Sequence, residues 1–226
     1  MRTGRVRTHQ WAGRAVPSAA VKDEVAEPVW LDTLGLAGDE QADRRNHGGP
    51  DKALLVYAGH HYPRWRLDEG LDLPFGAFFE NITLAGVAGR PGPDETTVVL
   101  GETWRLGGAV VQVSQPRSPC YKLASRWGVA DLVVRVQRTG WSGWYVRVLA
   151  PGLVTKGDAV ELLERPVGAP TMAEIARIVN VDKHDLDGAR RLVDTPGLPE
   201  RWHRKLLARL AGATEDDSTR LLGPAQ

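Results

Sequence analysis

The chain has 226 residues, of which 25% are charged and 42% hydrophobic, as in an ordinary folded protein. Its formal net charge of +1 gives no overall attraction to nucleic acid or to an anionic membrane. Cys120 is the single cysteine, which excludes an intrachain disulfide and favours a cytoplasmic location. Because no apolar run approaches the roughly 20 residues that cross a bilayer, we expect no membrane partner.

Residues 1–164 predict a mainly β domain. Short β-prone runs alternate there with turn residues such as Gly and Pro, which is typical of a meander or a barrel. Apolar runs that are too long for a strand and have helical spacing indicate a few helices within this domain. We expect strands within 11–36 and at 53–57, 97–100, 103–106, 109–113, 144–149 and 160–163, with helices at 60–69 and 123–136.

The composition changes after Glu164. Two prolines and a glycine within 165–170 indicate a linker, and 171–212 predict a small three-helix domain. The first helix begins with a capping box at Thr171 and Glu174, and the third runs from Pro199 to Gly212. Residues 213–226 are expected to be a disordered tail. The third helix is basic, but the near-neutral net charge favours a solvated face over a DNA-binding helix.

A polar stretch at 38–52 contains a glycine-rich turn that is a candidate anion site. Gly48 and Gly49 allow backbone N–H groups to converge on an anion, since they tolerate positive φ and carry no side chain. Arg44, His47 and Lys52 add cationic donors around the turn. Local pattern does not separate a phosphate cradle from an ordinary solvated loop.

Two further polar pairs follow this turn. The neighbouring His60 and His61 are expected to diverge on a helix or strand, which disfavours a metal site there. Glu80 and Asn81 lie beside bulky apolar residues, so they either are half-buried with specific partners or cap a turn.

Cys120 lies in a stiff segment that follows a predicted strand. Pro116 and Pro119 restrict the backbone on either side of Ser118, and Arg117 and Lys122 flank the thiol. Nearby positive charge favours a thiolate, which is the form that binds metals and attacks electrophiles. The alternative is a small buried apolar residue, which is common for a free cysteine.

Several sequence blocks, in order along the chain, carry a family resemblance. They include Gly38–Asp39 with 41–43, 47–49 with 51–53 and Tyr57, 76–78 with 80–83, 113–117 with 119–123, Thr139–Gly140, 143–145 with 147–149, and Gly157–Asp158. With these blocks the chain resembles the MOSC domain family, named for the C-terminal domain of molybdenum cofactor sulfurase. It is most similar to stand-alone bacterial members of the hydroxylaminopurine-resistance type, which carry an appended three-helix domain.

The resemblance implies a MOSC-type β-barrel fold and molybdenum-cofactor (molybdopterin) chemistry. Cys120 is then the sulfur carrier or the molybdenum ligand. A soft thiolate suits such a metal, and the cofactor ends in a phosphate that a cationic turn can hold. The residues expected to bind the cofactor are Arg44, His47, Gly48, Gly49, Lys52, Asn81, Ser114, Arg117 and Lys122.

Three functional hypotheses follow. The first is a molybdenum-dependent oxidoreductase that reduces small N-hydroxylated bases or amines and takes electrons from a separate donor protein, since the chain has no cysteine cluster and no dinucleotide fingerprint. The second is a sulfur carrier whose Cys120 persulfide comes from a pyridoxal-phosphate cysteine desulfurase. The third is a non-enzymatic nucleic-acid-binding module, which is disfavoured by the charge.

The chain departs from the family pattern in three places. Phe79 stands where the family usually has glycine, so we expect an altered backbone before Glu80 or a narrower pocket. Tyr121 replaces the more usual tryptophan. The family has a strand before the region that matches Arg5–Trp11, and the chain starts almost there, so either the start was assigned too late or the barrel lacks an edge strand.

Overall fold

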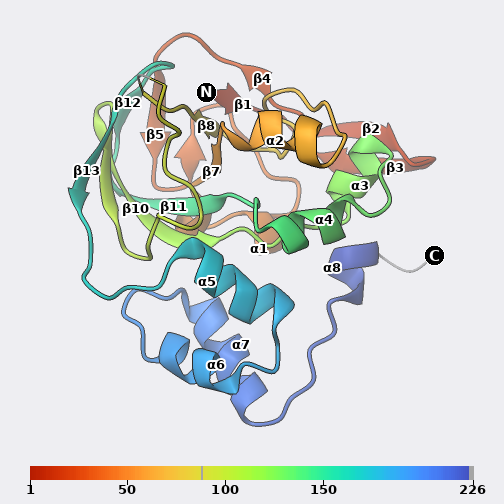
Figure 1. Cartoon of the computed structure of the whole chain (residues 1–226). Helices are drawn as coiled ribbons and strands as arrows, with labels where there is room; N and C mark the ends of the chain where they lie inside the picture. Colours follow the sequence, from red (N-terminus) through yellow and green to blue (C-terminus); the bar gives the residue numbers. More distant parts are fainter. Residues whose placement is uncertain (88, 224–226) are drawn as a thin grey trace.

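The computed structural model describes residues 1–87 and 89–223, and its largest element is a six-stranded sheet that curls around the core (Figure 1). Its strands are β7 (Leu54–Ala58), β8 (Ile82–Leu84), β9 (Thr103–Leu106), β10 (Ala109–Pro116), β11 (Trp144–Ala150) and β13 (Val160–Glu164). The order across the sheet is β13-β9-β10-β11-β7-β8, and β7 and β8 form its one parallel pair within the described residues. The domain is therefore mainly β and barrel-like, as predicted.

The long central strand β10 sets the core. Ala109, Val111 and Val113 alternate toward the interior, where they are at most 1% exposed. Between Val113 and Gln115 the register with β11 shifts by one residue, so Ser114 is the extra residue of a β-bulge. The bulge bends β10 just before the segment that carries Cys120.

The N-terminal third builds three small sheet elements beside the main sheet. They comprise a β1–β4 pair (Arg2–Thr3, Asp23–Glu24), a β2–β3 hairpin (Arg7–Trp11, Arg14–Ser18), and a three-stranded sheet of β5 (Val29–Asp32), β6 (Gly35–Leu36) and β12 (Gly152–Val154). Residues ahead of Arg5 contribute the short strand β1, which pairs with β4, and the Arg2 N–H donates to Asn81 O at 2.7 Å.

Three helices cover one end of the barrel around a second apolar cluster that includes Trp65, Phe78 and Leu123. They are α2 (His61–Asp68), α3 (Lys122–Trp127) and α4 (Leu132–Thr139). The single helix predicted at 123–136 is thus two helices, because Gly128 takes a left-handed φ of 65° and ends α3. Within the described part of the chain, no helix is long and apolar enough to span a bilayer.

The predicted strand at 97–100 is a series of turns that joins the barrel to the C-terminal helices. Val99 makes only an isolated bridge with Thr171, and the Met172 N–H donates to Val98 O at 2.8 Å. The strand prediction failed because Val98 and Leu100 are buried under the helices rather than in a ladder.

The C-terminal part consists of helices that pack under the barrel (Figure 1). They are α5 (Met172–Ala176), which continues as a π-helical turn η2 (Arg177–Val181), then α6 (Leu186–Val193), α7 (Glu200–Leu210) and α8 (Ser218–Leu222). Thr171 caps α5 by accepting from the Glu174 N–H at 3.1 Å. Met172, Ile175 and Leu206 are fully buried and belong to the same apolar core as the sheet. The helices are therefore joined to the barrel by a common interior.

The expected disordered tail has a defined path as far as residue 223. It contains α8, which packs near α3 (Figure 1). Asp217 in this segment forms ion pairs with Lys183 at 2.7 Å and with Arg220 at 3.0 Å. Residues 224–226 lie outside the described residues.

Candidate functional site

Cys120 lies in the loop between β10 and α3 and is 7% exposed. Hydrogen bonds hold this loop at several points: the Arg117 N–H donates to Gly143 O at 2.9 Å, and the Tyr121 N–H to Arg220 O at 2.8 Å. The Arg220 guanidinium donates in turn to Pro119 O at 2.7 Å. These bonds act together with the two prolines, so the thiol sits on a segment with little conformational freedom.

A cavity of about 90 Å³, here called the thiol cavity, opens beside Cys120. Side chains from well-separated parts of the chain form its wall, and five of them are basic. The wall includes Lys22, His47, Lys52, Phe79, Asn81, Arg117, Lys122 and Tyr145. Lys22 is neutralised by an ion pair with Asp39, whereas among the described residues Lys52, Arg117 and Lys122 form no ion pair with a carboxylate. Asp39, Glu40 and Asp43 also line the cavity, but Asp39 pairs with Lys22, so the three cations without an ion pair outnumber the two remaining carboxylates and suit an anion.

The glycine turn positions His47 and Lys52 at this cavity. Asp43 caps the short helix α1 (Arg44–His47) by accepting from the Asn46 N–H at 3.1 Å. Gly49 has a φ of 100°, which turns the chain into a 3-10 helix, η1 (Pro50–Lys52). Gly48 and Gly49 do not line the cavity, so their contribution is the turn that brings the His47 and Lys52 side chains to it.

Burial and mutual repulsion perturb both basic groups on this turn. Burial, with the added charge of Lys52, Lys122 and Arg117, lowers the pKa of His47 to about 4. Burial and the charge of Arg201 lower the pKa of Lys52 to about 8. His47 is therefore a neutral imidazole near pH 7, which corrects its expected role as a cation, and Lys52 remains mostly charged.

Arg117 is the most buried cation of the thiol cavity, at 4% exposed. Its Nη1 has no hydrogen-bond partner among the described residues, although a buried guanidinium nitrogen normally has one. Its guanidinium lies 5.7 Å from the centroid of the Phe79 ring. A donor without a partner, beside a cavity, is a group available to a ligand.

Phe79 forms part of the cavity wall in an unusual backbone conformation. Its φ is 67°, in the left-handed region where side chains are disfavoured. This explains why glycine is usual here in the family that the sequence resembles. The ring stacks on Trp11 at 6.4 Å between centroids and lines the cavity, so the backbone keeps a conformation that suits glycine, and the narrower pocket stays a prediction.

Three other residues expected at the site have different surroundings. Asn81 lines the cavity, but its amide is engaged: Nδ2 donates to Asp39 at 2.9 Å, and Oδ1 accepts from the Leu55 N–H at 3.1 Å. The buried Ser114 hydroxyl donates to Asp51 O at 2.6 Å and secures the β-bulge. Arg44 is exposed on α1 and lines neither cavity at Cys120.

A second and larger cavity, of about 500 Å³, lies between the barrel and the C-terminal helices and is here called the interdomain cavity. It shares His47, Lys52, Cys120 and Lys122 with the thiol cavity, so the thiol lies where the two meet. Arg201, Trp202 and Lys205 bring the basic face of α7 to its other wall. The sequence predicts that this helix is basic, but its pattern does not show that the basic face lies against a cavity.

One contact fixes α7 against the barrel beside this cavity. The Trp202 Nε1–H donates to the side-chain oxygen of Gln115, which follows the bulge in β10. Asp217 also lines the cavity, where burial alone would raise its pKa, but hydrogen bonds from Arg220 and Lys183 outweigh burial and lower the pKa. The wall therefore combines the cations Lys52, Lys122, Arg201, Lys205 and Arg220 with the carboxylates of Asp43, Asp216 and Asp217.

Comparison with known proteins agrees with this architecture. The MOSC domain family model matches residues 43–161, and the YiiM-like, 3-alpha helix domain model matches residues 170–213. Protein YiiM of Escherichia coli (strain K12) is 41% identical over 211 residues, which cover 92% of this chain and 91% of that protein. A protein named "Reductase" from Gibberella moniliformis is 34% identical over 183 residues, covering 79% of this chain and 31% of the fungal protein.

A solved structure shows the same arrangement over nearly the whole chain. The crystal structure of YiiM from Geobacillus stearothermophilus superposes with a TM-score of 0.75 at 33% identity, covering 93% of this chain and 96% of the other. The overall fold of the chain, from the curled sheet to the appended helices, thus also occurs in a known protein. The chain belongs to the MOSC domain family and carries a YiiM-like three-helix domain.

Proposed function

We propose that the protein is a molybdenum-cofactor-dependent reductase of N-hydroxylated bases or amines, with Cys120 as the metal ligand. The observation that carries the proposal is the thiol cavity itself. One thiol faces a space whose cations Lys52, Arg117 and Lys122 have no carboxylate partner within the described residues. The fungal relative named "Reductase" supports redox chemistry for this fold.

The residues present fit a phosphate-bearing pterin that carries molybdenum. A thiolate is a soft ligand, and Lys52, Lys122 and the unpartnered Nη1 of Arg117 are suited to a phosphate. When bound, the cofactor supplies two-electron oxygen-transfer chemistry. Conversion of N–OH to N–H consumes two electrons and two protons and releases water, so a separate donor protein has to deliver the electrons.

The chain's own groups handle binding and protons in this proposal. The ammonium of Lys52, with a pKa of about 8, is a proton donor matched to neutral pH. The neutral imidazole of His47 accepts or donates a hydrogen bond without adding charge. The interdomain cavity, which reaches Cys120 from the side of α7, admits the small substrate while the thiol cavity holds the cofactor's anionic end.

The test is metal and pterin content in protein purified from a host that makes the cofactor. We expect about one molybdenum per chain in the wild type, and a loss of at least tenfold in Cys120→Ser, because the thiolate ligand is removed. Lys52→Met, which removes a cation of the thiol cavity, should also lower the pterin content, and Lys156→Met, which removes an exposed lysine outside both cavities, is its matched control. With a chemical electron donor, N-hydroxylated purine reduction should follow molybdenum content.

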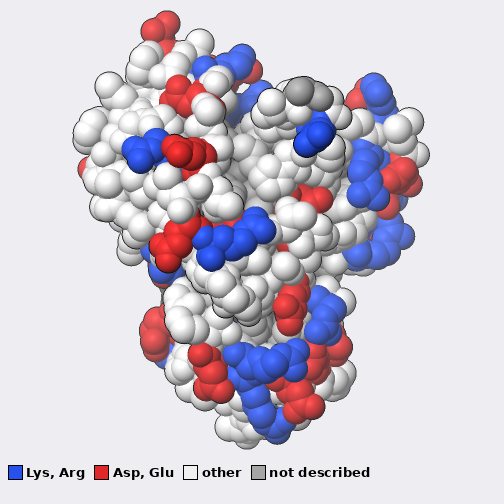
Figure 2. Space-filling model, turned by 60° about the vertical axis from the view of Figure 1, so that its left-hand side comes forward, with Lys and Arg blue, Asp and Glu red and all other residues white. Residues whose placement is uncertain are grey.

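The same purified protein also tests the two alternative hypotheses, the sulfur carrier and the nucleic-acid-binding module. Cyanide-labile sulfur on Cys120 without molybdenum would replace the reductase by the sulfur carrier served by a cysteine desulfurase. Salt-dependent binding to DNA with neither signal would favour the nucleic-acid module. The surface argues against the latter, because Figure 2 shows Lys and Arg interleaved with Asp and Glu over the C-terminal helices.

A further inference from the structure

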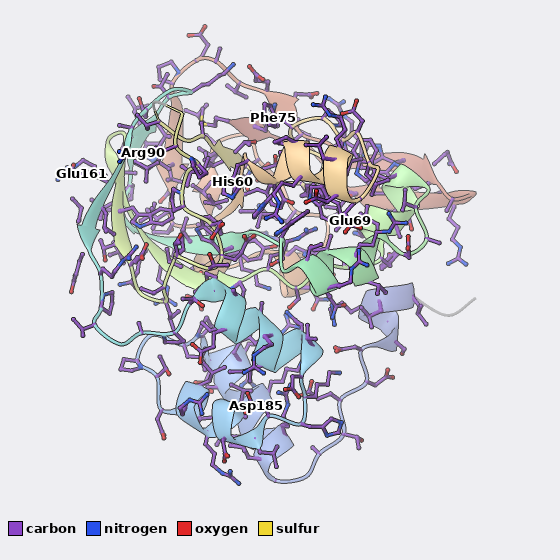
Figure 3. The ribbon with its side chains drawn as sticks, in the orientation of Figure 1. His60, Glu69, Phe75, Arg90, Glu161 and Asp185 are labelled. Atoms are coloured by element: carbon purple, nitrogen blue, oxygen red, sulfur yellow. The ribbon has the colours of Figure 1, made fainter. Side chains whose placement is uncertain are left out.

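His60 and His61, at the start of α2, form a cluster with Asp94 that is separate from both cavities at Cys120. His60 precedes the helix whose last turn is followed by Glu69, and these two residues mark its two ends in Figure 3. One ligand atom from each of His60, His61 and Asp94 lies within 4.8 Å of the others. None of the three lines the thiol cavity or the interdomain cavity. The sequence-based expectation that the two imidazoles diverge is wrong, since their ring centroids are 4.6 Å apart.

Each imidazole is oriented by a carboxylate. His61 Nε2 lies 2.7 Å from Glu95 Oε2, and His60 Nε2 lies 3.2 Å from Asp94 Oδ2. Because a carboxylate only accepts, Nε2 carries the proton in each pair and Nδ1 of the neutral ring keeps its lone pair. Both Nδ1 atoms are buried and have no partner among the described residues, and His61 itself is 1% exposed. His61 has the arrangement typical of a metal ligand, because Nδ1 is free and Glu95, which is not itself a ligand, holds the other ring nitrogen.

We propose that His60, His61 and Asp94 bind a divalent transition metal ion of the zinc class, with Glu95 as the carboxylate that orients His61. Two imidazoles and a carboxylate are a common zinc ligand set, and water completes the tetrahedron. Ligands about 2.0–2.1 Å from zinc in a tetrahedron lie roughly 3.3 Å from one another. The separation of 3.2 Å between His60 Nε2 and Asp94 Oδ2 matches this spacing, so an ion can lie between these two atoms once the His60 proton moves from Nε2 to Nδ1.

The proposed metal site is open to solvent, and hydrogen bonds connect it to Arg117 in the thiol cavity. The His60 and Asp94 side chains are each 22% exposed, so an ion can enter from solvent. The second oxygen of Glu95 accepts from the Gly143 N–H at 2.6 Å, and Gly143 O accepts from the Arg117 N–H at 2.9 Å. An ion on His61 therefore tightens the contacts that position Arg117 in the thiol cavity, and it links α2 to the loop at Asp94.

The experiment uses chelator-treated full-length protein made in a host that lacks the molybdenum cofactor, so that its result is independent of the proposed reductase. Calorimetric titration with Zn²⁺ should give one equivalent, and Co²⁺ should give the visible absorption bands of a tetrahedral site. At a hundredfold excess over Kd, zinc should raise Tm by roughly 5 to 10 °C.

The variants locate the ion. His60→Gln and Asp94→Asn, which change partly exposed side chains, should weaken zinc binding at least tenfold while the circular dichroism spectrum is unchanged. The exposed His184→Ala should bind as the wild type does. Cys120→Ala should also keep its equivalent, which excludes capture of zinc by the thiol. Binding that is lost in Cys120→Ala, unchanged in His60→Gln and Asp94→Asn, or absent from the wild type would overturn the proposal.

Discussion

Lys52 and His47 share one wall of the thiol cavity, and burial is the main reason that the pKa of each side chain is low. The two differ in consequence. His47, with a pKa of about 4, is neutral throughout the physiological range, whereas Lys52, with a pKa of about 8, changes its charge just above it. The change with pH of the charge that the cavity presents to an anion is therefore due to Lys52.

Anion affinity should fall as pH rises through about 8. The folded-state pKa of Lys52 lies below its ordinary 10.5, and a bound anion raises it, so the protonated form binds and deprotonation weakens binding. Sulfate, a dianion across this range, is the probe for calorimetry at pH 7 and pH 9. We expect about a tenfold loss of affinity in the wild type. Lys52→Arg should remove most of this loss, because arginine keeps its charge; an equal loss in both would contradict the assignment.

Phe79 offers a second test at the level of one residue. At a φ of 67°, alanine retains the backbone strain of phenylalanine and glycine does not. Phe79→Gly should therefore be more stable than Phe79→Ala by about 1 kcal/mol, the reverse of the usual order, in urea unfolding. Both variants lose the ring that contacts Trp11 and Arg117, so the comparison isolates the backbone. Greater stability of the alanine variant would show that the left-handed conformation is wrong.

At the scale of elements, α8 holds in place the loop that carries Cys120. Arg220 donates to Pro119 O and forms an ion pair with Asp217, while its own carbonyl accepts from the Tyr121 N–H. A short helix has little stability of its own, so these contacts hold it in place. The loop that carries Cys120 is thus secured from both sides, by Gly143 within the barrel and by α8.

Weakening the contacts between α8 and this loop should expose the Cys120 thiol. Arg220→Met removes the bond to Pro119 O and the pair with Asp217, so we expect Cys120 to react with a thiol reagent about tenfold faster, through more frequent local opening. Arg190→Met also removes an i,i+3 pair, with the exposed Asp187, and is the matched control. If both variants react at the wild-type rate, α8 does not control access to the thiol.

Over the whole molecule, the sequence predicted best the features that depend on short stretches of the chain or on sequence motifs. The mainly β barrel, the three C-terminal helices and the grouping of Lys52, Arg117 and Cys120 came from short blocks whose residues lie close in the chain or are marked by the family resemblance. The break at Gly128 was missed because a glycine inside an apolar helical pattern is often tolerated. The turns at 97–100 were missed because burial under helices gives the same apolar run as a strand.

The interdomain cavity could not have been predicted in this way. Lys22, Arg201 and Lys205 reach the neighbourhood of Cys120 only because the N-terminal strands and α7 dock against the barrel. Nothing in the local pattern of α7 distinguishes a residue that faces a cavity from one that faces water. The same limit applies to His60 and Asp94, which lie 34 residues apart in sequence.

The hydrogen bond between Trp202 and Gln115 makes Trp202 fluorescence a probe of the contact between the barrel and the C-terminal helices. The Trp202 indole lines the interdomain cavity, donates to Gln115 and has the Lys205 ammonium 5.9 Å from its ring centroid. Indole fluorescence depends on nearby charge and hydrogen bonding, so a ligand that enters between barrel and helices changes the emission of this residue. The difference between the wild type and Trp202→Phe isolates that signal from the other tryptophans, and occupancy of the cavity can be followed without any label.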